Sequence, residues 1–315
     1  MERITTIAAM RTRIREHRLA GRTVALVPTM GALHEGHLSL VHRAASEADV
    51  TVVSIFVNPT QFDRADDLSA YPRDLAGDEG RLRGLAEAAP AIVFAPAAEE
   101  LYPRPPVTAV TVAGLDAHLC GASRPGHFAG VGLVVTKLFA IVTPDVAVFG
   151  RKDRQQLQIV RRLTEDLDLG VRIVAGPTVR EADGLARSSR NQRLGPDDRP
   201  AARRLSEALR AAVLDAREAR RSGAPIDPTA LLATARGALD DPRVVVDYLE
   251  VVDPDTMAPT REPLTGHGRL VVAVAAEVGP VRLIDNVEVG DIEDEDGLLA
   301  ATAGDALPHA GTAGG

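Results

Sequence analysis

The sequence predicts an α/β protein in which a doubly wound parallel sheet is followed by a smaller α+β domain. First, apolar runs of strand length alternate with helical patterns through the first half of the chain, which is typical of a parallel sheet with helices on both faces. Second, the pattern changes after Asn191, and third, 315 residues are enough for two domains. The expected strands of the first domain are Val24–Val27, Val50–Phe56, Ala91–Ala95, Val146–Phe149 and Val171–Ala175.

The second domain is expected to begin near residue 187. Helical periodicity covers Ala201–Arg221. Strands of a small sheet are expected at Val244–Val252, Arg269–Ala275 and Val281–Ile284. From Glu288 onward Asp, Glu, Ala and Gly dominate, a composition typical of disorder. The expected division is therefore 1–186, 187–287 and a disordered tail over 288–315.

The composition excludes several classes of function. A net charge of −8 argues against a nucleic-acid partner, because such binding needs a basic face. The single Cys rules out an internal disulfide and suits a reducing compartment. The first twenty residues read as a polar helix rich in Arg, and the sequence has no apolar run near 18 residues. We therefore expect a cytoplasmic protein with no membrane partner.

A Gly-containing turn with two histidines follows the first expected strand. Thr23–Val27 is apolar, and Leu38–Ala44 reads as a helix. A strand that enters a helix through such a turn directs backbone N–H groups and the helix dipole at one spot, which favours an anion such as phosphate. His34 and His37, three residues apart, would add donors to that anion. Two alternatives stay open: a pair of capping histidines, and a metal site, which lacks a third ligand nearby because the only Cys is Cys120.

Other polar side chains also come directly after expected strands. In doubly wound sheets, ligands bind beyond the carboxyl ends of the strands, near the point where the strand order reverses. The candidates are His34 and His37 after the first strand, Asn58 and Gln61 after the second, and Lys152 and Asp153 after the fourth. We expect these loops to form one site.

The longer motifs resemble a known family. His-x-Gly-His is similar to the signature of nucleotidyltransferases related to class I aminoacyl-tRNA synthetases. The fuller set resembles the pantothenate synthetase family, and its motifs occur in the family's order over roughly the first 285 residues. These motifs are Pro28–His37, Phe56–Phe62, Tyr71–Arg73, Arg124–Phe128, Phe149–Gln156 and Ala182–Asn191.

The resemblance implies a Rossmann-like fold and a specific activity. Members of the family join pantoate to β-alanine at the expense of ATP through a pantoyl-adenylate, and release AMP and pyrophosphate. Mg²⁺ should accompany ATP, held chiefly by phosphates and water. The resemblance also implies a homodimer formed through the first domain, and a second domain that covers the active site.

The family motifs assign roles to individual residues. The catalytic residues would be His37, His34 and Lys152. The ATP-binding residues would be Met30, Gly31, Ala32, Leu33, His34, Glu35, Gly36, His37, Gly150, Arg151, Lys152, Asp153, Val179, Arg187, Ser188, Ser189 and Arg190. The pantoate and β-alanine residues would be Gln61, Gln156, Asn58, Arg124 and His127, and Asp78 is a candidate metal ligand.

Alternatives remain for several of these residues. Lys152 could form a surface salt bridge with Asp153, and Asp153 could cap the next helix. Residues 188–191 could be an ordinary loop or cap. Two other functions compete with the ligase. The first is a nucleotidyltransferase that releases pyrophosphate without joining two substrates, and the second is a nucleotide-binding module without catalytic activity. The first would have no need of a pantoate pocket, and the second would be expected to have lost His34, His37 or Lys152.

Three arginines depart from the family pattern. Arg151 stands where an acidic residue is common, Arg154 where an aromatic residue usually precedes the glutamine pair, and Arg187 where Met usually precedes the serines. Each is expected to add positive charge beside the triphosphate site. None of them removes a group that the chemistry requires.

Overall fold

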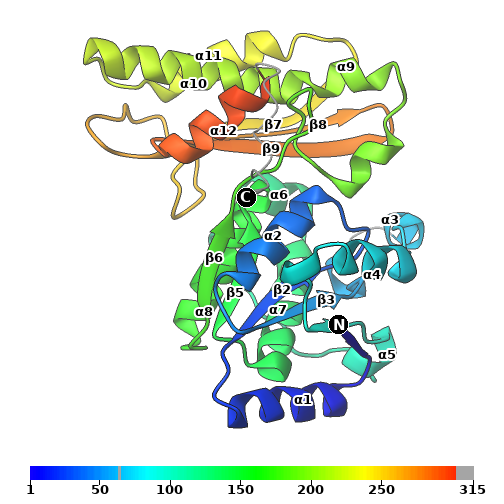
Figure 1. The fold of residues 1–315 in the computed structure, drawn as a ribbon. Coiled ribbons are helices and arrows are strands. Elements are labelled where there is room, and N and C mark those ends of the chain that lie inside the picture. Colours follow the sequence, from blue (N-terminus) through cyan, green and yellow to red (C-terminus); the bar gives the residue numbers. More distant parts are fainter. Residues whose placement is uncertain (63–64, 303–315) are drawn as a thin grey trace, which may run out of the picture. The chain divides into compact units, whose positions relative to one another are not determined.

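The computed structural model describes residues 1–62 and 65–302, and it divides the chain into two compact units (Figure 1). The first unit is Met1–Gly176 and the second begins at Pro177. The expected boundary at 186/187 therefore lies too late. Residues 177–186 belong to the second unit because Arg180 pairs with Ala186 in a short antiparallel bridge and its guanidinium binds Asp285.

The first unit contains a six-stranded, all-parallel sheet with the strand order β1-β4-β3-β2-β5-β6. Its strands are β1 (Glu2–Ile4), β2 (Val24–Thr29), β3 (Val50–Ile55), β4 (Ile92–Phe94), β5 (Val146–Gly150) and β6 (Arg172–Gly176). The five expected strands are confirmed within a few residues, and β1 is an addition at the edge. The order reverses between β2 and β5, so this pair forms the switch point of the doubly wound sheet.

Helices cover both faces of this sheet (Figure 1). They are α1 (Ile7–Leu19), α2 (Glu35–Ala45), α3 (Ala65–Ala70), α4 (Leu75–Arg83), α5 (Ala98–Leu101), α6 (Leu119–Ser123), α7 (His127–Val142) and α8 (Arg154–Asp166), with short 3₁₀ turns η1 (Pro59–Gln61), η2 (Ala86–Ala88) and η3 (Arg151–Asp153). Alternate strand residues such as Ala25 and Val27 pack with Leu40 and Val41 of α2 and with Leu82 of α4. This cluster is aliphatic, and buried phenylalanines of the unit such as Phe94 and Phe139 lie outside it.

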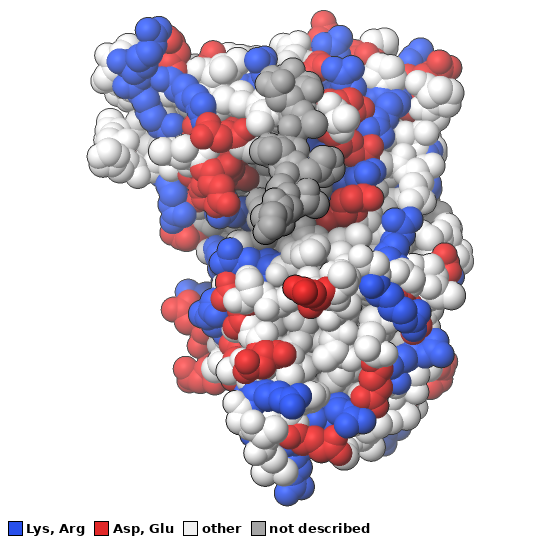
Figure 2. Space-filling view, viewed as in Figure 1, with Lys and Arg blue, Asp and Glu red and all other residues white. Residues whose placement is uncertain are grey.

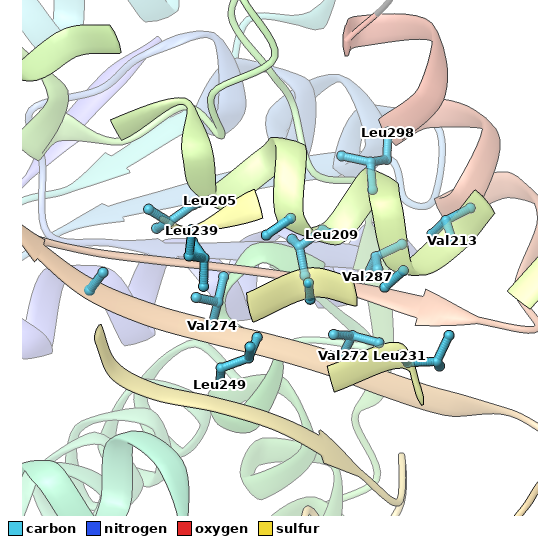
Figure 3. Close-up of a cluster of buried hydrophobic side chains, with 14 of the residues drawn as sticks. Leu205, Leu209, Val213, Leu231, Leu239, Leu249, Val272, Val274, Val287 and Leu298 are labelled. Carbon is cyan, nitrogen blue, oxygen red and sulfur yellow. The ribbon is translucent and has the colours of Figure 1, made fainter. Parts of the chain in front are cut away.

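The second unit is an α+β fold with an antiparallel three-stranded sheet. Its elements are η4 (Ser189–Arg193), α9 (Asp198–Ala202), α10 (Arg204–Ser222), α11 (Pro228–Ala238), β7 (Val244–Val252), β8 (Leu270–Val278), β9 (Val281–Val289) and α12 (Ile292–Thr302). Leu205, Leu209 and Val213 of α10 pack on Val274 and Val287 of the sheet (Figure 3). The expected α+β character is confirmed.

The expected disorder from residue 288 is wrong for the part of the tail that the structure describes. Strand β9 continues to Val289, and α12 follows it. Leu298 is only 1% exposed within the core of the second unit. Glu295 accepts hydrogen bonds from Arg217 (2.8 Å) and Arg220 (2.8 Å) of α10. The acidic composition therefore serves ion pairing, while residues 303–315 lie outside the described residues.

Charged side chains of both signs are interspersed over the face in Figure 2. The net charge of −8 is therefore not gathered into one acidic field on that face. Over residues 1–62 and 65–302, no helix has the length and apolar character needed to cross a bilayer.

Candidate active site

The two histidines lie where strand β2 passes into helix α2. His34 is the N-cap residue of α2, with an extended backbone, and His37 stands in the first turn. The backbone N–H of His34 donates to Nδ1 of His37 over 3.3 Å, and the ring centroids are 4.0 Å apart. The two histidines therefore do cap the N-terminus of α2, as one of the alternatives from the sequence predicts. This arrangement also leaves the imidazole proton of neutral His37 on Nε2, because Nδ1 is the acceptor.

His37 is held in its neutral form. Burial, followed by the nearby His34, lowers the pKa of His37 from 6.5 to about 3. The charges of Asp153 and Lys152 also act on this pKa, Asp153 raising it and Lys152 lowering it. A neutral imidazole still donates one N–H, so His37 can serve as a hydrogen-bond donor at physiological pH.

The backbone before His34 adopts an unusual turn. Gly31 has φ 80° and Ala32 has φ 50°, so two consecutive residues occupy the left-handed region. For Ala32 this conformation costs roughly 1–2 kcal/mol. Such turns present successive N–H groups in a concave arrangement that binds an anion.

A carboxylate of the protein occupies this arrangement. Asp78 Oδ2 accepts from the N–H of Ala32 over 2.9 Å, and Oδ1 accepts from the N–H of Leu33 over 2.7 Å. The expectation that the N–H groups of this turn are directed at a phosphate is therefore wrong for Ala32 and Leu33. The N-terminus of α2, which begins at Glu35, remains the part of the segment suited to an external anion.

Asp78 lacks the surroundings of a metal ligand. It is only 3% exposed, and both of its oxygens face the backbone of the turn. Within the described part of the chain, no three His, Cys, Asp or Glu side chains are grouped to hold a metal ion. The suggested role of Asp78 as a metal ligand is therefore not supported by its contacts.

Lys152 and Asp153 follow strand β5 in the turn η3, next to the loop after β2. Strands β2 and β5 are neighbours, and both charges influence His37. Lys152 Nζ and Asp153 Oδ1 are 3.9 Å apart, at the outer limit of an ion pair. Asp153 occupies the N-cap position of α8, but its side chain makes no capping hydrogen bond with any described residue. The structure therefore brings together the loops carrying Gly150, Arg151, Lys152 and Asp153 and the histidine turn.

Asn58 and Gln61 lie in the loop after β3. Asn58 is 1% exposed, and its Nδ2 donates to Gln61 Oε1 (3.0 Å) and to the carbonyl of Gly130 (3.1 Å). Its Oδ1 accepts from the hydroxyl of Tyr102 (3.0 Å). The hydrogen bonds of Asn58 are thus made within the protein, so it orients Gln61, and the expected direct contact of Asn58 with substrate is not supported.

Gln61 is the centre of this polar cluster. Its Nε2 contacts the Met30 sulfur at 3.0 Å, which joins the loop after β3 to the loop after β2. The carbonyl of Gln61 accepts from Arg124 Nη2 (3.3 Å) and lies 2.8 Å from His127 Nδ1. Four predicted residues, Asn58, Gln61, Arg124 and His127, are therefore together. Gln156 lies partly exposed on α8, the helix that follows η3.

The sequence reasoning missed three residues, of which Tyr102 and Gly130 support this cluster. Tyr102 holds Asn58, and Gly130 lies so close to the loop that an added Cβ would collide with the Thr60 carbonyl. Gln155 donates through Nε2 to the carbonyls of Leu115 (2.8 Å) and His118 (2.7 Å). Only Gln155 carried a signal in the sequence, because it belongs to the glutamine pair.

Comparisons with known proteins agree with this geometry. The family model described as Pantoate-beta-alanine ligase matches residues 2–288. The chain belongs to the pantoate-β-alanine ligase family. It is 49% identical to the pantothenate synthetase of Thioalkalivibrio sulfidiphilus over 92% of this chain and 98% of that protein. It is 48% identical to that of Salinibacter ruber, with the same coverage, 92% and 98%.

Solved structures agree with this membership of the pantoate-β-alanine ligase family. The pantothenate synthetase of Thermus thermophilus superposes with a TM-score of 0.81 at 43% identity, over 92% of this chain and 99% of that one. The pantoate-β-alanine ligase of Francisella tularensis, solved with beta-gamma ATP and beta-alanine, gives 0.72 at 32% identity over 91% and 97%.

The remaining ATP-binding residues expected from the ligase family lie in the second unit. The N–H of Arg187 donates to the carbonyl of Val179 over 2.8 Å. Ser188 is the N-cap of η4, where its Oγ accepts from the N–H of Arg190 over 3.2 Å, so residues 188–190 do form a capped turn with Ser189 in it. Their contact with ATP stays a prediction.

The unusual arginines of this ligase differ in their surroundings. Arg187 forms an ion pair with Glu181 at 3.3 Å, so part of its charge is neutralised within the second unit. Arg154 is buried at the start of α8, and Arg151 lies in η3 beside Lys152. The effect of these three arginines on the triphosphate site stays a prediction.

Proposed function

We propose that this chain joins pantoate to β-alanine at the expense of ATP, through a pantoyl-adenylate, with the reacting groups supplied by the loops after β2, β3 and β5. The observation that carries the proposal is that the loops carrying His37, Lys152 and Asp153 follow the neighbouring strands β2 and β5 at the switch point of the sheet. Membership of the pantoate-β-alanine ligase family supports the substrates.

The first step is attack of the pantoate carboxylate on the α-phosphorus of ATP, with pyrophosphate as leaving group. The protein has to position the reactants and neutralise charge on the phosphate oxygens. We assign the Nε2–H of His37 as a donor to these oxygens, with His34 beside it. Lys152 supplies a positive charge on a flexible stem that can follow the oxygens into the transition state.

The second step uses the activated acyl group. The amine of β-alanine attacks the acyl carbon of the adenylate, the bond to AMP breaks, and the ammonium proton passes to solvent. We assign pantoate to Gln61, Gln156, Arg124 and His127. Gln61 is suited to this because its Oε1 is held by Asn58 and its Nε2 retains a second N–H for a pantoate oxygen.

Mg²⁺ is proposed to enter with ATP. Both oxygens of Asp78, the candidate metal ligand, face backbone N–H groups. The described residues therefore fit an ion that is coordinated by phosphate oxygens and water better than an ion that is coordinated by protein side chains. Such an ion would neutralise charge on the departing pyrophosphate.

A homodimer and a cytoplasmic location complete the proposal. Family resemblance supports the dimer, and the single Cys, which is buried at position 120, suits a reducing compartment. Light scattering at several protein concentrations tests the dimer, and fractionation of the source cells tests the location.

The proposed order of steps is tested by isotope exchange. The protein is incubated with ATP, magnesium and pantoate, and exchange of labelled pyrophosphate into ATP is measured before β-alanine is added. We expect exchange that depends on pantoate but not on β-alanine, followed by pantothenate and AMP once the amine is present. Exchange that proceeds equally well without pantoate would favour a nucleotidyltransferase.

A further inference from the structure

We propose that Asp78 is a positioning residue for adenylation, and that it does this by holding the turn between β2 and α2 in its left-handed conformation. This inference rests on the proposed function, since it concerns the segment that carries His34 and His37. The two carboxylate oxygens bind two successive backbone N–H groups, those of Ala32 and Leu33. A single side chain therefore fixes the backbone immediately before the N-cap of α2.

The fit between Asp78 and the turn is tight. A Cβ added at Gly31 would lie 2.8 Å from Asp78 Oδ2, so only glycine leaves room for the carboxylate. Gly31 also has φ 80°, which disfavours other residues. The left-handed backbone and the close approach of Asp78 therefore both require glycine at position 31. The Gly31-Ala32-Leu33 segment and Asp78 form one unit, although 45 residues separate Leu33 from Asp78.

Asp78 is itself rigidly held. It lies in the first turn of α4, whose N-cap Asp74 accepts from the N–H of Gly77 over 2.9 Å. Leu82, one turn later, is fully buried in the core beneath β2 and α2. The carboxylate is therefore anchored to the sheet and not to the loop that it binds. Movement of the turn relative to the sheet would break both hydrogen bonds.

The left-handed conformation of Ala32 explains why such a clamp is needed. A non-glycine residue with φ 50° is strained and persists only where its surroundings impose it. Charge-assisted hydrogen bonds to a buried carboxylate are stronger than neutral ones. Release of the turn would let Ala32 relax, and the start of α2 would shift with it. A displacement of His37 by about 1 Å is enough to lower a rate by about 100-fold.

The helix α4 offers a matched control. Glu79 is the neighbouring residue and is also a buried carboxylate, but it forms ion pairs with Arg3 (3.4 Å) and Arg83 (2.9 Å), and among the described residues no hydrogen bond joins it to the turn. Glu79→Gln therefore removes the same charge from the same helix. Asp78→Asn replaces one acceptor by an NH₂ group, which cannot accept an N–H, and Asp78→Ser shortens the side chain.

The experiment has two readouts. The first is hydrogen exchange of the Ala32 and Leu33 amides, followed by NMR of the ¹⁵N-labelled full chain without ligands. The second is pantoate-dependent pyrophosphate exchange. We expect both amides to be protected in the wild type and in Glu79→Gln, and to exchange faster in Asp78→Asn and Asp78→Ser. The maximal exchange rate should fall about 10- to 100-fold in the Asp78 variants, with the pantoate KM within about twofold.

Each outcome bears on the proposal. Rapid exchange of both amides in the wild type would overturn the clamp, even if no Asp78 variant folds. A normal maximal rate in a folded Asp78→Asn protein, or an equal loss in Glu79→Gln, would remove Asp78 as a positioning residue. Absence of pantoate-dependent exchange in the wild type would instead contradict the proposed function, while protection of the two amides would still support the clamp.

Discussion

The side-chain amide of Asn58 donates to Oε1 of Gln61 over 3.0 Å, so one buried side chain sets the orientation of another. Asn58 also donates to the carbonyl of Gly130 and accepts from Tyr102 and Thr60. The residue proposed to bind pantoate is therefore held by a residue that need not touch pantoate itself.

Replacement of Asn58 by Asp should weaken pantoate binding. The variant would place a second oxygen against Gln61 Oε1 and the Gly130 carbonyl, with no donor for either. An unpaired buried group costs about 1–3 kcal/mol, so we expect the pantoate KM to rise about 5- to 150-fold. Tyr102→Phe, which removes one donor to Asn58 and keeps its amide, should have a smaller effect. Pantoate saturation curves measure both, and an unchanged KM in Asn58→Asp would contradict the orienting role.

Replacement of Lys152 by Ala should slow adenylation with little effect on the fold. Loss of one group that stabilises transition-state charge lowers rates by about 100- to 1,000-fold. Pantoate-dependent pyrophosphate exchange measures the effect. The chain has one other lysine, Lys137, which lies 5.4 Å from the centroid of the Tyr102 ring, so Lys137→Ala is the charge-matched control and should retain most of the rate. Equal losses in the two variants would remove Lys152 from the chemistry.

The low pKa of His37 should make stability fall in acid. His37 has a pKa of about 3 when folded and about 6.5 in the ordinary state, so between these values the unfolded chain binds more protons. The free energy of unfolding therefore decreases as pH falls from 6.5 toward 3, by at most about 1.4 kcal/mol per pH unit from this residue. Above pH 6.5 the contribution does not change.

Urea unfolding at pH 7.5 and pH 5 tests this effect. The wild type should lose more stability between the two pH values than His37→Gln does, because glutamine does not titrate. His42→Gln is a suitable control, since this histidine lies in the last turn of the same helix. If the wild type and His37→Gln lose the same stability, His37 is not held neutral in the folded state.

Helix α12 should contribute to the stability of the second unit. Leu298 is 1% exposed, and Leu→Ala at buried sites costs about 2–5 kcal/mol, so Leu298→Ala should lower the free energy of unfolding by this amount. Ile292, on the same helix, is 70% exposed, and Ile292→Ala should have little effect. Thermal and urea unfolding measure both variants. Equal stabilities for the two would mean that α12 is not docked in solution.

The sequence was most informative where a local pattern decides the structure. Uniform apolar runs indicated the buried strands β2, β3 and β5, and the turn containing Gly31 indicated the start of α2. Strand β1 was missed because it has only three residues and only one of them, Ile4, is buried, so no apolar run marks it. The composition of the tail predicts disorder, whereas Glu295 binds arginines of α10.

The connections within the site could not be predicted from the sequence. Asn58 meets Tyr102 and Gly130 across 44 and 72 residues of chain, and nothing in the local pattern encodes such contacts. The contacts of Asp78 could not be predicted for the same reason. A carboxylate near a nucleotide motif suggests a metal, but its actual partners are backbone N–H groups, which carry no sequence signature.

The pairing of β2 with β5 bears on how the site can respond to its reactants. In the part of the chain that the structure describes, these strands pair only through Ala25–Val146 and Leu26–Ala147, whereas β2 and β3 pair over six residues. The carboxyl-terminal residues of β2 and β5 are therefore not tied to each other by ladder hydrogen bonds. The ends of β2 and β5 are instead paired to β3 and β6, so the ATP proposed to bind both loops would join these two strand ends directly.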